Sequence, residues 1–418
     1  MYPNKSLVGL VLPAVLAATA LTACGGSSGG GSASGGGSIT IGILHPFTGN
    51  YAGVGAASLG GAKVAAKLIN DAGGIMGKKL VIKTADTLGD PADAVPALNK
   101  LLNVDHAVAV VGPGGLEAGS TIPILDRNSI PYMLQAGNTA FDKMSDKWGF
   151  RTNPSDSQLS VAMAVFAADQ GYKRAAMVFS TIESAQTLKA PIADQFKKLG
   201  GTIVADLNLT PAQTSYNSEV VKVLNSKPDV IFTQMEPPTA SVFLNNMEQT
   251  AGLKIPLVGS DITAGSDFIS AVTPARATKV VYSLTGASPP SGAGSIFAAA
   301  YQTVNGTAPL SDANYGYDAT IVLALAIQQA KSTKGQAIVD AISKVSSAPG
   351  TVVQSYADGL KALEAGQEIN YDGASGPMDY NQYHNVFGPF QAVKSDASGK
   401  AVVVKMLTAK ELEDAQAK

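Results

Sequence analysis

A strand–helix–strand unit opens with Ser38-Ile39-Thr40-Ile41-Gly42-Ile43-Leu44, whose β-branched residues predict a short buried strand. Residues 54–71 follow as a predicted helix, with one apolar face made of Leu59, Ala62, Ala66 and Ile69. The pair Gly73-Gly74 ends this helix, and residues 79–85 (KLVIKTA) form the next predicted strand. A helix between two short apolar strands is typical of a parallel sheet.

The same alternation continues along the chain and then restarts. Further strands are predicted at 107–112 and 131–136, and after residues 151–156 a second series begins at 174–180, 202–209, 229–234, 256–260 and 278–285. Four helical patterns follow without strands between them, at 294–304, 316–331, 335–346 and 352–366. Strand-like pieces at 376–380, 386–393 and 400–406 come last. Because the late helices have no strands of their own, we expect them to cover the first sheet, which requires the chain to cross between two lobes more than once.

Composition excludes several classes of protein. The chain has 418 residues with 45% hydrophobic side chains, which argues against disorder and predicts two or three domains. Its net charge of -2 gives no electrostatic case for binding nucleic acid. One cysteine and three histidines exclude an internal disulfide framework and a zinc cluster. We therefore expect no metal and no cofactor.

The first residues have the pattern of a secretory signal. A short segment with Lys5 precedes an apolar stretch at 7–23, which is too short and too closely followed by glycines for a membrane span. Leu21-Thr22-Ala23-Cys24 resembles the bacterial lipobox, which predicts a lipoprotein signal peptide over 1–24 with lipid on Cys24; the alternative is a cysteine placed there by chance. Residues 25–38 are rich in Gly and Ser and predict a flexible tether.

Motifs along almost the whole folded part resemble one family. They include Phe47-Thr48-Gly49, the run at 69–80 (INDAGGIMGKKL), Val111-Gly112-Pro113, the segment 151–156, Val258-Gly259-Ser260-Asp261, Tyr317-Asp318-Ala319 and Tyr371-Asp372-Gly373. In order and spacing, over residues 39–405, they resemble the branched-chain-amino-acid-binding receptors of ABC transporters, which are type I periplasmic binding proteins.

This resemblance implies an α/β fold of two doubly wound parallel-sheet lobes joined by three hinge crossovers. Lobe 1 would comprise 39–152 plus 284–370, lobe 2 would comprise 153–283 plus 371–406, and 407–418 would be a C-terminal tail. The lobes would close on a ligand as a hinged trap.

The resemblance also implies binding residues in three loops of the first lobe. Gly115 and Leu116 stand where the family usually has serine hydroxyls, so that only backbone donors remain there. Ala136 would offer its backbone, and Asn138 stands at a carboxylate-binding Ser or Thr position. Val54 replaces an aromatic wall residue, which would widen the pocket. A purely structural role as turn residues is the alternative for Gly115 and Asn138.

In the second lobe, Asp261 follows a predicted strand and matches the family's acidic residue for the ligand ammonium. Ser184 and Glu236 occupy positions where relatives often have tyrosine, and Tyr315 is a candidate wall residue. The alternatives are a surface loop or cap for Asp261, a solvated loop acid for Glu236 and simple packing for Tyr315.

These features predict an extracytoplasmic solute-binding receptor, anchored to the membrane by lipid, that captures a branched-chain or related amino acid for an ABC importer. Its partners would be the permease subunits, and it would be a monomer. An enzyme is disfavoured because the chain has no HExxH motif and no Walker pattern. Two alternatives stay open: a non-amino-acid ligand such as an amide or small aromatic carboxylate, and a ligand-sensing regulator.

Overall fold

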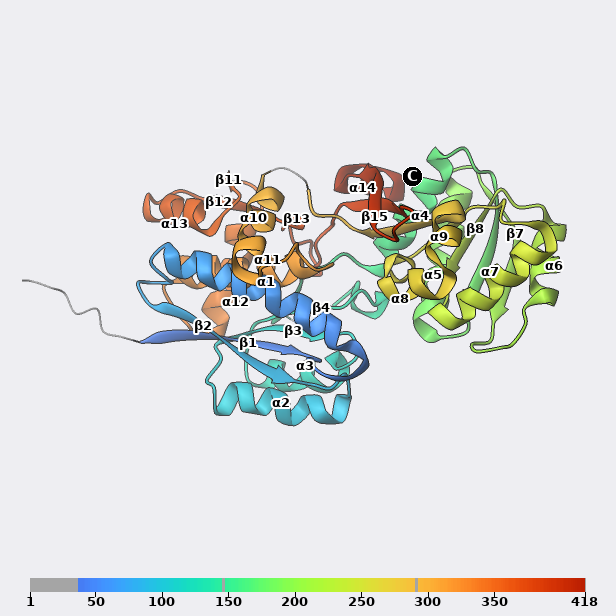
Figure 1. Ribbon diagram of the computed structural model, residues 1–418. Coiled ribbons are helices and arrows are strands. Elements are labelled where there is room, and N and C mark those ends of the chain that lie inside the picture. The colour runs from blue at the N-terminus through green and yellow to red at the C-terminus, as the bar shows by residue number, and fades with distance from the viewer. Residues whose placement is uncertain (1–36, 145–146, 290–291, 418) are drawn as a thin grey trace, which may run out of the picture. The chain divides into compact units, whose positions relative to one another are not determined.

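The computed structural model describes residues 37–144, 147–289 and 292–417 (Figure 1). The predicted signal segment, Cys24 and nearly all of the tether lie outside the described residues. Of the helices within the described ranges, none combines the length and the apolar character needed to cross a membrane.

The first sheet has five parallel strands. They are β1 (Ser38–His45), β2 (Lys79–Asp86), β3 (Ala109–Gly114), β4 (Tyr132–Gln135) and β5 (Gly149–Arg151), in the order β2-β1-β3-β4-β5. Strands β1 and β2 pair along their whole length, from Ser38 with Lys79 to His45 with Asp86. The strand–helix–strand unit predicted from residues 38–85 is therefore confirmed.

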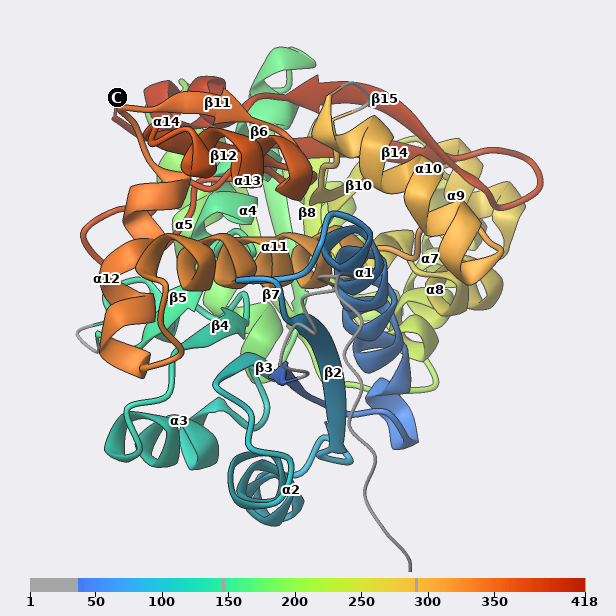
Figure 2. The same cartoon turned by 90° about the vertical axis from the view of Figure 1, so that its left-hand side faces the viewer.

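Side chains of β1 alternate between two cores. Ile39, Ile41 and Ile43 pack with α1 (Ala52–Asp71) and α11 (Ala313–Ala330), whereas Leu44 packs with α2 (Pro91–Asn103) and α3 (Ala118–Arg127). Figures 1 and 2 show these two helix pairs on opposite faces of the sheet. This period-two alternation is what a strand covered on both sides requires.

The late helices share the core of α1 and α11. They are α10 (Ala293–Asn305), α12 (Gly335–Ser346) and α13 (Tyr356–Glu364), and they contribute Phe297, Ile338 and Ala362 to it. They therefore cover the first sheet. The helix expected over 352–366 is shorter, because a strand, β11 (Thr351–Val353), precedes α13 and pairs with β12 (Ile369–Gly373).

The second sheet repeats the strand order of the first. Its parallel strands are β6 (Arg174–Ser180), β7 (Thr202–Leu209), β8 (Val230–Gln234), β9 (Leu257–Gly259) and β10 (Val281–Gly286), in the order β7-β6-β8-β9-β10. Two antiparallel strands, β14 (Phe390–Ser395) and β15 (Ala401–Leu407), extend it beyond β10. The helices packed around it include α4 (Asp156–Asp169), α5 (Glu183–Lys198), α6 (Asn217–Ser226) and α7 (Pro237–Ala251). The short helices α8 (Ser266–Val272) and α9 (Pro274–Val280) lead into β10.

Two segments differ from the sequence-based division of the chain. Residues after 370 were expected in the second lobe, but Tyr371, Met378 and Val386 are buried in the core of the first sheet. The Tyr371 hydroxyl donates to the buried Asp318 carboxylate at 2.7 Å, and the Ser375 backbone N–H donates to it at 2.7 Å. At the other end, the expected tail forms α14 (Ala409–Ala417), and its Leu412 packs in the core of the second sheet.

Helices α1 and α11 touch through their backbones. A Cβ atom on Gly61 would lie 1.9 Å from the carbonyl oxygen of Ala313, and one on Gly316 would lie 2.2 Å from the carbonyl oxygen of Ser58. Neither space can hold even a methyl group. Both views of the molecule show the two helices side by side (Figures 1 and 2).

Replacing Gly316 by Ala should therefore force the two helices apart. We expect the free energy of unfolding to fall by about 1–3 kcal/mol, the usual cost of overpacking, as measured by urea denaturation. Gly119→Ala, at an exposed helix position with nothing within 4 Å of the added Cβ, is the matched control. Equal stabilities for the two variants would contradict this account of the contact.

Candidate ligand-binding site

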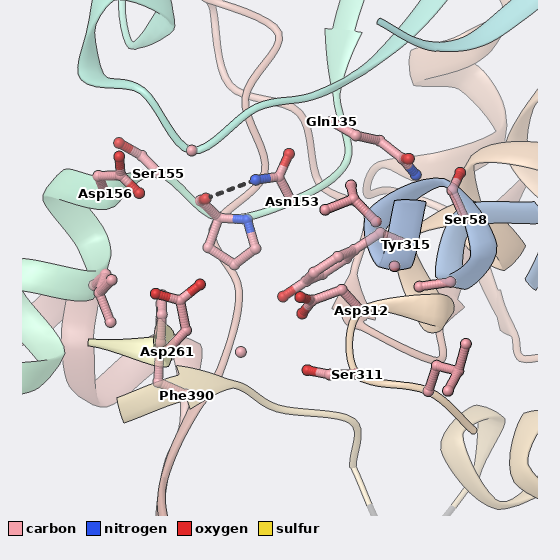
Figure 3. A pocket seen from close by; sticks show the side chains of 18 residues that line it. Ser58, Gln135, Asn153, Ser155, Asp156, Asp261, Ser311, Asp312, Tyr315 and Phe390 are labelled. Carbon is pink, nitrogen blue, oxygen red and sulfur yellow. Dashed lines mark hydrogen bonds between the residues drawn. The ribbon is translucent and has the colours of Figure 1, made fainter. Parts of the chain in front are cut away.

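A cavity of about 550 Å³ lies where elements of both sheets meet. Its walls come from the start of α1, the end of β4, the segment leading into α4, the loop after β9, the end of β10 and the start of α11 (Figure 3). Most of these lie at the carboxyl ends of strands, where open parallel sheets bind their ligands. The volume is in the range of sites for small molecules.

Three carboxylates from three different elements face this cavity (Figure 3). Asp156 is the first residue of α4, Asp261 follows β9 and Asp312 precedes α11. No lysine, arginine or histidine of the described residues lines the cavity, and none of their ion pairs includes one of these three acids. The site therefore concentrates negative charge in its wall, and the charge of Arg151, which is not a lining residue, offsets that of Asp156 only in part.

Protein surroundings and mutual repulsion raise the pKa values of these acids. The main cause is burial, and the second is the negative charge of Asp261. Together they raise the pKa of Asp156 to about 6 and that of Asp312 to about 7. The pKa of Asp261 is also raised by burial. Asp261 and Asp312 are exposed on the side that faces the open cavity, while protein surrounds them on the other sides. Near neutral pH the site thus carries less than its full negative charge and would gain charge when a cation arrives.

The side chain of Asp312 does not cap the helix that it precedes. It stands at the N-cap position of α11 with a left-handed backbone (φ 66°), but its side chain makes no capping hydrogen bond. Aspartate at this position commonly accepts a hydrogen bond from the first turn. Its carboxylate is left facing the cavity instead.

The one arginine near the cavity is already occupied. Arg151 is 1% exposed and donates to the carbonyl oxygens of Ala136 at 3.2 Å and Asn138 at 3.0 Å. Its other nitrogens donate to Asn385 and Asp142. With its donors committed to these partners, Arg151 is not placed to receive a carboxylate of a ligand.

Neutral donors without partners lie at another part of the wall. Ser58 is 3% exposed, and its hydroxyl has no hydrogen-bond partner among the described residues. The same holds for the side-chain nitrogen of Gln135, which Figure 3 shows beside Ser58. Asn153 donates to the Pro154 carbonyl at 3.2 Å, but its own buried oxygen also lacks a partner in this part of the structure.

His45 fixes the orientation of the Gln135 amide. Its Nε2 lies 2.7 Å from the Gln135 oxygen, and burial lowers the pKa of His45 to about 4, so the ring is neutral. An amide oxygen can only accept, so the His45 Nε2 carries the hydrogen and donates it. The amide nitrogen of Gln135 is thereby turned away from His45, as a donor for a group in the cavity.

Of the residues predicted from sequence, the cavity brings together Val54, Asp261 and Tyr315. Ala136 is buried beside it and uses its carbonyl for Arg151. Asn138 caps a short helical turn by accepting from the Ala140 backbone at 2.8 Å, which is the alternative role noted for it. Gly115 and Leu116 are not among the lining residues, and the Leu116 side chain is exposed.

Ser184 and Glu236 also lie outside the cavity wall. Ser184 accepts a hydrogen bond from Gln234 at 3.3 Å, and Glu236 accepts one from Ser180 at 2.8 Å. Their ligand contacts stay predictions.

Sequence reasoning missed Ser58, Gln135, Asp156 and Asp312. Ser58 lies one helical turn after Val54, Gln135 precedes Ala136 near the end of a predicted strand, and Asp156 ends the motif at 151–156, so that Asp312 alone of these four had no local signal.

Comparison with known proteins places these features in a family. The Leu/Ile/Val-binding protein BraC3 of Rhizobium johnstonii is 29% identical over 59% of this chain and 68% of its own length. The Leu/Ile/Val-binding protein homolog 3 of Brucella melitensis is 31% identical over 46% of this chain and 53% of its own. A substrate-binding protein of a chemotactic signal transduction system, BasB of Halobacterium salinarum, is 26% identical over 82% of this chain and 83% of its own.

Solved structures share the fold. The substrate-binding protein LivJ of Streptococcus pneumoniae, in complex with isoleucine, has a TM-score of 0.70 at 21% identity over 89% of this chain and 99% of its own. A solute-binding protein of R. palustris in complex with benzoate has a TM-score of 0.68 at 18% identity, over 89% of this chain and 97% of its own length. Residues 38–400 match the model of the periplasmic binding protein family, so the chain belongs to the periplasmic binding proteins.

Proposed function

We propose that this protein is the extracytoplasmic receptor of an ABC importer and captures an amino acid by closing two lobes around the cavity. Family membership indicates a location outside the cytoplasm and a role as a substrate-binding protein. The relatives named for Leu/Ile/Val binding and the isoleucine-bound neighbour support an amino acid as the ligand. The permease subunits of the importer would be its protein partners, and the receptor would act as a monomer.

The observation that carries this proposal is the polarity of the cavity wall. Buried polar groups in proteins are nearly always hydrogen-bonded, so unpartnered ones at a cavity point to a missing molecule. Ser58 and Gln135 offer donors to a carboxylate or carbonyl oxygen. Asp261, on an element of the other sheet, offers an acceptor to an ammonium. A ligand that joins these groups would hold the two lobes together.

A small aromatic carboxylate fits this wall less well. The R. palustris neighbour is bound to benzoate, but an anion in this cavity would meet Asp156, Asp261 and Asp312 while Arg151 is occupied. Like charges in a partly desolvated site repel strongly. The carboxylates therefore favour a ligand with a cationic group.

A role in sensing would use the same capture step. The name of the Halobacterium relative places that protein in a chemotactic signal transduction system. Loss of uptake of the ligand on deletion of the gene supports an importer, whereas unchanged uptake with lost chemotaxis would favour sensing.

Asp261→Asn keeps the shape of the side chain and removes the charge that would pair with the ammonium. We expect a loss of about 2–5 kcal/mol of binding free energy, or about 30- to several-thousand-fold in affinity, measured by calorimetry with the amino acid that binds the parent protein most tightly. Asp194→Asn, on the exposed face of α5, is the control and should leave the affinity unchanged. An unaltered affinity in Asp261→Asn would refute the role of Asp261.

Membrane attachment through Cys24 is a separate part of the proposal, and it rests on the lipobox-like residues 21–24. Cys24→Ala should move the protein from the membrane fraction to the soluble fraction without changing ligand affinity. Fractionation after a high-salt wash measures this, because salt removes proteins held only by charge. Retention of the variant in the membrane would show that another feature anchors it.

A further inference from the structure

We propose that the cavity selects a small basic amino acid, a ligand with two cationic nitrogens and one end rich in acceptor oxygens. This inference rests on the proposed function and narrows its ligand from an aliphatic amino acid to a net-cationic one. Two independent observations on the described residues carry it. One is a set of carboxylates without an ion-pair partner, and the other is a pair of buried donors without a hydrogen-bond partner elsewhere on the wall.

The first observation is a mismatch in charge. An aliphatic amino acid has one ammonium, whereas Asp156, Asp261 and Asp312 all face the cavity and have no ion-pair partner among the described residues. Closure would bury carboxylates that a single ammonium cannot neutralise, and burying an unpaired charge is costly. A second cationic nitrogen would remove most of that cost.

The positions of the three acids support two cationic groups. Asp156 lies against Gly137, where an added Cβ would come 2.3 Å from a carboxylate oxygen, so it is fixed near the β4 loop. Asp312 stands at the start of α11, beside Tyr315, and is not engaged in capping. Asp261 lies close enough to both to raise the pKa of each. The acids are thus spread along the wall, with Asp261 shared between the other two.

The second observation concerns the acceptor end of the ligand. The Ser58 side chain is 3% exposed in the cavity wall, and its hydroxyl has no hydrogen-bond partner in the described part of the chain. The Gln135 amide nitrogen beside it is turned toward the cavity by the bond from His45 to the Gln135 oxygen. Both groups are neutral donors and need an acceptor such as a carboxylate oxygen. A simple diamine would leave them unpaired, which is why we infer an amino acid.

Ornithine and norleucine form a matched pair of probes. They have the same length, but the terminal group of the side chain is an ammonium in ornithine and a methyl in norleucine. At pH 7.5 we expect calorimetry to show ornithine binding at least about tenfold more tightly than norleucine, the effect of one charge-assisted hydrogen bond.

Asp312→Asn tests whether Asp312 is the acid that pairs with the second cation, the side-chain ammonium of ornithine. We expect it to weaken ornithine binding about tenfold. Norleucine binding should not weaken and should tighten if it changes, because the variant removes a carboxylate that its single ammonium leaves unpaired. Asp194→Asn should change neither affinity. The melting temperature of each variant shows whether it is folded.

The pH dependence of ornithine binding gives a second readout on the same samples. A bound cation favours the ionised acids, so affinity should be full above the raised pKa of Asp312, about 7, and fall as the pH drops through it and through that of Asp156, about 6. The charged and titratable groups that act on these two acids are Asp261, Arg151, Asp142 and Tyr315, and Asp312 also accepts a hydrogen bond from the Ser311 side chain.

Norleucine binding as tightly as ornithine, or more tightly, would overturn the inference and leave the proposed function standing. If neither amino acid binds while another class of solute does, both the inference and the amino-acid part of the proposed function fail. If Asp312→Asn lowers the affinity for ornithine and for norleucine equally, Asp312 does not pair with the second cation. That result would also overturn the proposal.

Discussion

The backbone contact between α1 and α11 is the constraint on which the rest of the site depends. Gly61 and Gly316 let the two helices approach until each glycine meets a carbonyl oxygen of the other helix. This contact fixes Ser58 on α1 relative to Tyr315 and Asp312 at the start of α11. Tyr315 in turn reaches the second sheet, since a Cβ on Gly286 of β10 would lie 1.9 Å from the Tyr315 hydroxyl oxygen. One helix pair thus positions the Ser58 donor, one carboxylate and a contact to the other sheet.

The topology explains why acids from distant parts of the sequence meet. Both sheets have the same strand order, and loops at the carboxyl ends of their strands face one cavity. Asp156 and Asp261 come from loops more than a hundred residues apart, and Asp312 comes from the late helix that returns to the first sheet. Arg151 is bound by backbone carbonyls and Asp142, so its charge offsets that of Asp156 only in part. Among the described residues, none of the three acids has an ion-pair partner.

Much of the fold could be predicted from the sequence, because strands such as 38–44 and helices such as 335–346 have clear apolar periods. The site could be predicted only in part. The predictions for Asp261 and Tyr315 came from family resemblance. Asp312 lies in a loop before a helix, where its side chain could equally cap that helix. Asn138, which was expected at the ligand, caps a turn through its side-chain oxygen, and its ligand contact stays a prediction. Local sequence does not tell a cap from a binding residue, and only the long-range packing separates them.

The central claim is that a solute bound in the cavity joins groups from both lobes and so closes them. Small-angle scattering of the purified protein, with and without a saturating amino acid that binds by calorimetry, tests this most directly. We expect a smaller radius of gyration with the ligand. Identical scattering curves in the two states would contradict it.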